Sequence, residues 1–261
     1  MKEKPFLSVV IPAYNEEKRL PQTLEKISSF LMQQSYLSEI IIVDDGSQDK
    51  TSNISLPHFH PPLLEVRMLQ HHHNQGKGAA VKTGILKAKG KYILFTDADN
   101  STPISEVNKL LPYLITSSEQ EISQVAPTNN HSHYEIAIGS RHLQPQLVQI
   151  QQPFFRRALS RFANRIIQFL LLPGIVDTQC GFKLFFAPAA RRIFSQSRIK
   201  GWGFDLEILF LAQKMKYRIK EVPVIWLHSP YSRVRPLKAA IKTFAELLQI
   251  HLNNYRGYYS Q

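Results

Sequence analysis

Two carboxylates one residue apart follow an apolar run in the sequence LFTDADN, where Asp97 and Asp99 flank Ala98. They stand out because the chain has only 20 Asp and Glu against 32 Lys and Arg. Residues two apart on an extended segment point the same way. One carboxylate can then bind the ribose of a nucleotide while the other holds a divalent cation, and oxygen ligands suit Mg²⁺ or Mn²⁺. The alternative, a solvated loop that caps the next helix, stays open.

A second acidic pair ends another apolar run, in the sequence IIIVDDGS that contains Asp44 and Asp45. In wound parallel sheets, ligands bind beyond the carboxyl ends of the strands, where the strand order switches. We therefore expect the two acidic pairs to converge on one cleft. Their mutual repulsion there requires a cation or hydrogen-bond donors.

A glycine-flanked lysine opens a predicted helix in HNQGKGAAVKTGI, at Gly76, Lys77 and Gly78. Backbone N–H groups and a lysine at a helix start can bind a phosphate, although plain helix-start geometry is the alternative. The sequence has no P-loop and no G-x-G-x-x-G in its first turn, which argues against a dinucleotide dehydrogenase. The His71–His73 run invites interpretation as a metal site, but consecutive side chains on an extended segment alternate in direction and chelate poorly. We therefore interpret the run as a solvated or incidental cluster.

Apolar, β-branched runs alternate with helical patterns over the first 140 residues, which predicts a wound α/β sheet. The predicted strands are 6–11, 39–43, 64–70, 91–95 and 135–138, and the predicted helices are 17–32, 77–89 and 104–115. Farther along, the pattern predicts a helix at 205–216, a strand at 221–227 and a basic helix from about 237 to 253.

The composition narrows the class of protein. A net charge of +12 over 261 residues indicates an anionic partner, such as nucleic acid, an acidic membrane face or a phosphorylated substrate. The single cysteine, Cys180, excludes an internal disulfide, and we expect it to have a packing role. No apolar run reaches the roughly 18–20 residues that span a bilayer.

Six motifs occur in an order that resembles inverting family-2 glycosyltransferases of the GT-A fold: SVVIPAYNEEKRLPQTL, IIIVDDGSQDKT, NQGKGAAVKTGI, FTDADN, IGSR and DTQCGFKLF. DTQCGFK and the later GWGFDLEILFLAQ look most like the dolichyl-phosphate β-glucosyltransferase branch, with polyprenyl-phosphate hexosyltransferases close behind. The resemblance implies a Rossmann-like α/β fold with a mixed, mostly parallel sheet flanked by helices. It places the catalytic domain at 1–230, followed by a basic amphipathic helical segment at 231–261.

The resemblance also implies roles for individual residues. It implies a nucleotide-sugar pocket at Pro12, Ala13, Tyr14, Glu16, Asp44, Asp45, Lys77, Asp97 and Ala98. It implies Mg²⁺ or Mn²⁺ at Asp97 and Asp99, and catalytic roles for Asp99, Asp205 and Arg141. Acceptor-phosphate contacts are expected from Arg141, Arg156 and Arg157. Asp205 is a base candidate only by analogy, since Asp205 and Glu207 also suit a helix N-terminus.

The implied reaction moves glucose from UDP-glucose to dolichyl or polyprenyl phosphate with inversion. A phosphate acceptor with a second pKa near ~6 is mostly deprotonated at neutral pH, so positioning by arginines can outweigh a strong general base. Three alternatives stay open: GDP-mannose as donor, a saccharide hydroxyl as acceptor, and a non-catalytic nucleotide- or nucleic-acid-binding protein. A nucleic-acid-binding protein would leave the paired acids unexplained, and we expect no nucleic-acid partner.

Two basic amphipathic stretches predict contact with a membrane surface. One is FFRRALSRFANRIIQFLLL, which contains Arg156 and Arg157, and the other is the C-terminal YSRVRPLKAAIKTF. The alternative for the first is an ordinary core-facing helix with a solvated basic side. We expect a peripheral protein on the cytoplasmic face of a membrane.

Overall fold

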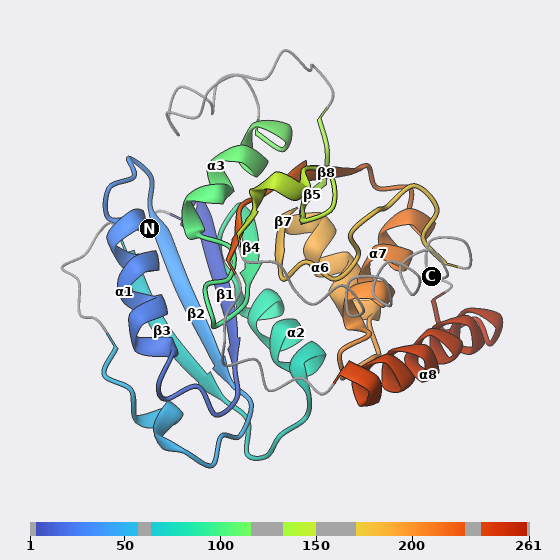
Figure 1. Ribbon diagram of the computed structural model, residues 1–261, viewed down its shortest axis with the longest axis horizontal. Helices are drawn as coiled ribbons and strands as arrows, with labels where there is room; N and C mark the ends of the chain where they lie inside the picture. Colours follow the sequence, from blue (N-terminus) through green and yellow to red (C-terminus); the bar gives the residue numbers. More distant parts are fainter. Residues whose placement is uncertain (1–3, 57–63, 116–132, 150–170, 228–235, 260–261) are drawn as a thin grey trace.

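The computed structural model describes residues 4–56, 64–115, 133–149, 171–227 and 236–259 (Figure 1). Seven strands form one sheet in the order β3-β2-β1-β4-β7-β5-β8, and β6 and β9 pair separately. Within the large sheet, β7 runs antiparallel to both β4 and β5, and the other pairs are parallel. The predicted α/β fold with a mixed, mostly parallel sheet is confirmed.

The strands of the large sheet are short and mostly apolar. They are β1 (Leu7–Ala13), β2 (Ser38–Asp44), β3 (Leu64–Gln70), β4 (Tyr92–Thr96), β5 (Ile136–Ser140), β7 (Phe182–Phe186) and β8 (Ile219–Pro223). The small pair consists of β6 (Val148–Gln149) and β9 (Trp226–Leu227). Every residue of β1, β2, β4 and β5 is buried, as expected for strands covered on both faces.

Helices cover the two faces of this sheet (Figure 1). They are α1 (Leu20–Leu31), α2 (Lys77–Lys87), α3 (Val107–Leu110), α6 (Ala187–Gln196), α7 (Phe204–Lys214) and α8 (Pro236–Tyr255). Alternate residues of β1 point to opposite faces, so Val10 joins a core with α2, α6 and α7 while Val9 and Ile11 join a core with α1 and α3. The sheet is therefore sandwiched between two apolar layers.

Several boundaries differ from the sequence prediction. The chain from 104 to 115 forms short 3₁₀ and α segments instead of one helix, because Pro112 lacks the N–H that a continuous helix needs. The strand predicted at 221–227 is split into β8 and β9. Strand β7 and helix α6 were not predicted.

Helix α8 belongs to the same packed body as the sheet. Its residues Leu247 and Ile250, together with Tyr259 just after it, are buried in the core that α7 and α2 share. The described part of the predicted 231–261 segment thus packs against the helices that cover the sheet. Among the described residues, no helix combines the length and the hydropathy needed to cross a bilayer.

One buried acid ties the amino-terminal edge of the sheet together. Glu39 in β2 is fully buried, and its carboxylate accepts hydrogen bonds from Ser8 Oγ at 2.6 Å, the Lys89 backbone N–H at 2.5 Å and Arg67 Nη2 at 3.0 Å. The carboxyl end of β2, where Asp44 lies, is at the opposite end of the strand.

Glu39→Ala is expected to lower the free energy of unfolding by about 3–5 kcal/mol, because it leaves Arg67 and two other donors without their partner. Urea unfolding measures this loss. Glu65→Ala on neighbouring β3 is the control, since the Glu65 side chain is 57% exposed and its loss should change stability by no more than about 0.5 kcal/mol. Equal losses in both variants would contradict the structural role of Glu39.

Candidate active site

The strand order switches direction between β1 and β4. From β1 the chain continues outward to β2 and β3, whereas β4 lies on the other side of β1. In open α/β sheets the crevice beyond the carboxyl ends at such a switch point is the usual ligand site. Here it receives the turn after β1, the start of α2, and the loop after β4 that contains Asp97 and Asp99.

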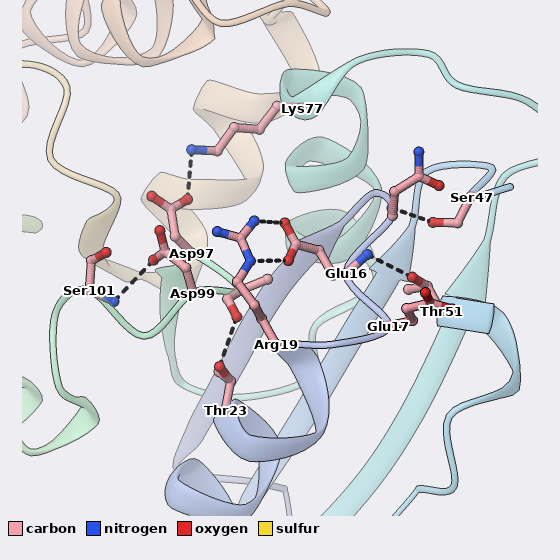
Figure 2. A network of polar contacts seen from close by, with 12 residues as sticks. Glu16, Glu17, Arg19, Thr23, Ser47, Thr51, Lys77, Asp97, Asp99 and Ser101 are labelled. Atoms are coloured by element: carbon pink, nitrogen blue, oxygen red, sulfur yellow. Dashed lines mark hydrogen bonds and ion pairs between the residues drawn. The ribbon is translucent and has the colours of Figure 1, made fainter. Parts of the chain in front are cut away.

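The loop after β4 is held by hydrogen bonds on both sides. The Asp97 N–H donates to the carbonyl of Gly181 at 3.2 Å, and Thr23 of α1 donates to the carbonyl of Ala98 at 2.8 Å. A Cβ atom at residue 181 would lie 2.0 Å from Asp97 Oδ2, so glycine leaves room for the carboxylate in this position. Asp99 Oδ1 accepts the Ser101 N–H at 3.0 Å (Figure 2). The two carboxylates are therefore preorganised.

Lys77, the first residue of α2, neutralises part of this charge. Its Nζ lies 2.6 Å from Asp97 Oδ1 and 4.9 Å from the ring centroid of Trp202. Burial tends to lower the pKa of Lys77, but the surrounding carboxylates, chiefly Asp97 and Asp205, outweigh this effect and raise it. Lys77 is therefore a cation inside the crevice, as its predicted role near a nucleotide requires.

A second cation, Arg19, was not predicted. It forms a two-point ion pair with Glu16, and Figure 2 places its guanidinium beside the loop that carries Asp97 and Asp99. Burial lowers the pKa of Arg19, but the hydrogen bond and charge of Glu16 outweigh it, and the two aspartates add to the rise. Glu16, predicted to line the nucleotide pocket, thus orients an arginine toward the acidic loop.

The turn after β1 forms the other wall. Pro12 and Ala13 end the strand, and Tyr14 is 41% exposed. The Glu16 N–H donates to Thr51 Oγ1 at 2.7 Å, which fixes the turn against the segment after β2. Tyr14 is therefore the residue of this turn whose ring is open to a ligand.

Asp44 has one unused oxygen. Its Oδ1 accepts the Ser47 N–H at 3.1 Å, and its Oδ2 is buried without a hydrogen-bond partner among the described residues. A buried acceptor left unpaired costs free energy, so this oxygen suits an N–H or O–H group of a bound molecule. That is the chemistry expected of a nucleotide-binding residue.

Asp45 has a different environment. Its Oδ1 accepts the Gln75 N–H at 3.0 Å and its Oδ2 accepts the Gly76 N–H at 2.8 Å. Its Oδ1 also lies 2.7 Å from Nδ1 of His71. Asp45 thus fixes the loop that leads into Lys77, which favours a positioning role over direct contact with a nucleotide. Of the histidine run interpreted as solvated or incidental, His71 is not solvated, because its side chain is only 10% exposed.

Asp205, the base candidate, is one half of a buried ion pair. Lys183 in β7 is fully buried, and its Nζ donates to Asp205 Oδ1 and to the carbonyl of Cys180, both at 2.6 Å. Burial raises the pKa of Asp205, and Lys183 and Lys77 partly offset the rise. The carboxylate is thus committed to a lysine. Lys183 was not among the predicted site residues. The sequence feature that could have indicated its role is a single lysine inside the apolar run FKLFF.

Arg141, at the end of β5, is fixed by Asp177. Its Nε and Nη2 each lie 2.8 Å from an oxygen of Asp177, which is fully buried. Burial raises the pKa of Asp177, but Arg141 outweighs it and lowers the pKa. The hydroxyls of Ser140 and Thr178, the residues next to this pair, are buried without partners in the described part of the chain. The fixed Arg141 guanidinium is 25% exposed, so it can donate to an anionic ligand as well as to Asp177.

Cys180 is buried and interacts electrostatically with both residues of this pair. Burial, followed by the charge of Asp177, raises the pKa of its thiol to about 12, so the sulfur is an apolar packing group and not a nucleophile. The two other predicted acceptor-phosphate residues, Arg156 and Arg157, lie outside the described residues.

Asp97 and Asp99 can bind a divalent cation whose remaining ligands come from a bound molecule. No group of three or more His, Cys, Asp and Glu side chains in the described ranges could hold a metal alone. Asp97 and Asp99 supply hard oxygen donors, and the Lys77 ammonium on Asp97 shows that positive charge is accommodated there. This donor set suits Mg²⁺ or Mn²⁺ completed by phosphate oxygens.

The sequence model of Glycosyl transferase family 2 matches residues 8–194, which spans the sheet from β1 through β7 and the acidic loop. The chain belongs to glycosyltransferase family 2. The match ends within α6, so α7 and α8 lie beyond it.

Curated relatives of this family-2 chain are similar over nearly its whole length. It is 38% identical to a dolichyl-phosphate β-glucosyltransferase of Dictyostelium discoideum, covering 97% of this chain and 76% of that protein. The enzyme of the same name from Homo sapiens is 37% identical, with 96% and 76% covered. That of Saccharomyces cerevisiae is 36% identical, with 98% and 77% covered.

Solved structures share the fold at lower identity. Glucosyl-3-phosphoglycerate synthase from Mycobacterium tuberculosis, in complex with Mn²⁺, UDP-glucose and phosphoglyceric acid, is 19% identical with a TM-score of 0.62, covering 94% of this chain and 79% of that one. The same protein with Mg²⁺ and UDP gives a TM-score of 0.57 at 19% identity, with 94% and 79% covered. At this identity the likeness establishes the fold.

Proposed function

We propose that this family-2 glycosyltransferase moves glucose from UDP-glucose to dolichyl or another polyprenyl phosphate, with inversion. The observation that carries the proposal is the carboxylate pair Asp97 and Asp99, fixed beside the Lys77 ammonium at the switch point of the sheet. The relatives that are 36–38% identical, all named dolichyl-phosphate β-glucosyltransferases, support this choice of donor and acceptor.

The donor side consists of the turn after β1, the end of β2 and the start of α2. The unpaired Asp44 Oδ2 offers an acceptor to the nucleotide, and the exposed ring of Tyr14 offers it a surface. Lys77 and Arg19 bring fixed positive charge toward the diphosphate, which stabilises the charge that develops as UDP departs.

Asp97 and Asp99 would hold Mg²⁺ or Mn²⁺ at the diphosphate. A bound divalent ion supplies Lewis-acid stabilisation of the leaving group. The chain itself contributes the rigid loop that keeps both carboxylates on one side of the crevice, through the Gly181 and Ser101 contacts.

Arg141 is the acceptor-side residue. Both β4 and β5 run antiparallel to β7, which lies between them. Their carboxyl ends therefore lie at the same edge of the sheet, separated by two strand spacings, or about 10 Å. This spacing leaves room for a hexose between a diphosphate at Asp97 and Asp99 and a phosphate at Arg141. Because a phosphate acceptor is already deprotonated, no free base is needed, which agrees with the commitment of Asp205 to Lys183.

A lipid acceptor requires approach to a membrane, and α8 provides a suitable face. Leu248 and Leu252 are 50% and 52% exposed and Tyr255 is 91% exposed, at spacings of four and three residues that place them on one side of the helix. Exposed Lys214 and Arg256 lie at the same end of α8. This apolar stripe with flanking cations suits an anionic lipid surface. The predicted cytoplasmic, peripheral location is part of the same proposal.

Transfer is tested with purified protein, Mn²⁺, radiolabelled UDP-glucose or GDP-mannose, and a short polyprenyl phosphate or an oligosaccharide. Label from UDP-glucose should enter the lipid phase, and Asp99→Asn should lower the rate at least about 100-fold with unchanged circular dichroism. Glu25→Gln on the exposed side of α1 should retain the wild-type rate. Lipid label from GDP-mannose alone, transfer to the oligosaccharide alone, or full activity of Asp99→Asn would each contradict the proposal.

Membrane contact is tested by co-sedimentation with vesicles. The wild-type chain should bind vesicles rich in phosphatidylserine, less so at high salt because screening weakens the electrostatic part. The triple variant Leu248→Ser, Leu252→Ser, Tyr255→Ser should lose most of this binding and keep its thermal midpoint, since these side chains are exposed. Equal binding by the variant and the wild-type chain would show that this face of α8 does not contact the membrane.

A further inference from the structure

The loop at 198–203, between α6 and α7, carries Trp202 to the mouth of the crevice. Trp202 is 45% exposed, and the Lys77 ammonium lies 4.9 Å from its ring centroid. The carbonyl of Lys200 in the same loop accepts the Ala79 N–H in the first turn of α2 at 3.3 Å. The position of this loop therefore sets the surroundings of Lys77.

Both ends of the 198–203 loop are held by carboxylates tied to the C-terminal segment. At the far end, Glu246 of α8 accepts the Gly203 N–H at 2.6 Å. At the near end, Glu207 accepts the N–H groups of Arg198 and Ile199, and the hydroxyl of Tyr259 donates to Glu207 at 2.5 Å. Main-chain bonds to buried carboxylates are strong, so the loop is clamped from two sides.

The approach of α8 to the loop is close. Glu246 is 8% exposed, although it belongs to a helix whose neighbouring residues Ala245 and Leu248 are exposed. A Cβ atom at residue 203 would lie 2.8 Å from Glu246 Cβ, so glycine is required for this contact. A cavity of about 400 Å³ adjoins the loop and is lined by Gly76, Lys200 and Glu246 among others.

We propose that Glu246 is a positioning residue for the transfer reaction, acting through the Gly203 N–H to hold Trp202 against Lys77. Helix α8 thereby fixes one wall of the crevice, although it lies outside the residues matched by the family model. The kinetic part of this inference rests on the proposed function, and the spectroscopic part does not.

The spectroscopic test uses the fact that the chain has two tryptophans, Trp202 and Trp226. In a Trp226→Phe background, emission reports Trp202 alone. Glu246→Ala should shift this emission and raise its quenching by iodide, because the ring leaves its fixed place. Glu246→Gln should restore the wild-type signal, since its amide oxygen still accepts the Gly203 N–H. His251→Ala, an exposed change on α8, should have no effect. An unmoved Trp202 signal in Glu246→Ala would overturn the proposal.

The kinetic test is a double-mutant cycle in the natural background. Glu246→Ala and Trp202→Ala should each lower kcat/KM about tenfold, as misplacement near a reacting group does, and the double variant should be no worse than either single one. Additive losses would show that Glu246 acts elsewhere and would also overturn the proposal. If wild-type protein transfers no sugar, the proposed function fails, while the fluorescence result still decides the position of the loop.

Discussion

Charge balance in the crevice is the constraint on which the site depends. Asp97, Asp99 and Asp205 all interact electrostatically with Lys77. Asp205 is buried and Asp97 is 34% exposed, and nearby cations compensate their charge. Lys77 pairs with Asp97, and Lys183 pairs with Asp205. A buried charge that loses its partner is strongly destabilising. Lys183 is therefore as necessary to the site as Asp205, its buried partner.

This balance explains how distant parts of the chain build one site. Lys77 begins α2, Lys183 lies in β7 and Asp205 lies in the first turn of α7, so each ion pair also fixes one element against another. Arg141 and Asp177 do the same at the end of β5. The donor and acceptor regions thus keep their separation through buried polar pairs, and the sheet supplies the frame on which those pairs are mounted.

Local patterns account for what the sequence predicted well. Strands β1, β2, β4 and β5 are largely apolar runs, and the acids of DDGS and DADN lie at the ends of two of them. The strands and the acidic residues could therefore be predicted from short stretches of sequence. Strand β7 was missed because Lys183 interrupts its apolar pattern. That lysine is tolerated only because Asp205, 22 residues later in the chain, lies beside it.

The roles of three side chains, Asp45, Arg19 and Glu246, were predicted incompletely or not at all for the same physical reason. Asp45 reads like a second ligand-binding acid, yet its oxygens accept hydrogen bonds from Gln75 and Gly76, about 30 residues away. Arg19 lies inside a quoted motif but received no role from it, and Glu246 lies outside every quoted motif. Their roles depend on the residues that the fold places opposite them. A motif identifies which residues can do chemistry, whereas tertiary contacts decide which of them are already engaged.

The most direct test of this account is calorimetric titration of Mn²⁺ into the protein in the presence of saturating UDP. The wild-type chain should bind one Mn²⁺ tightly with UDP and only weakly without it, because Asp97 and Asp99 supply too few ligands alone. Asp97→Asn and Asp99→Asn should each abolish the UDP-dependent binding, while Glu65→Gln should not change it. Undiminished Mn²⁺ binding in both aspartate variants would contradict the central claim.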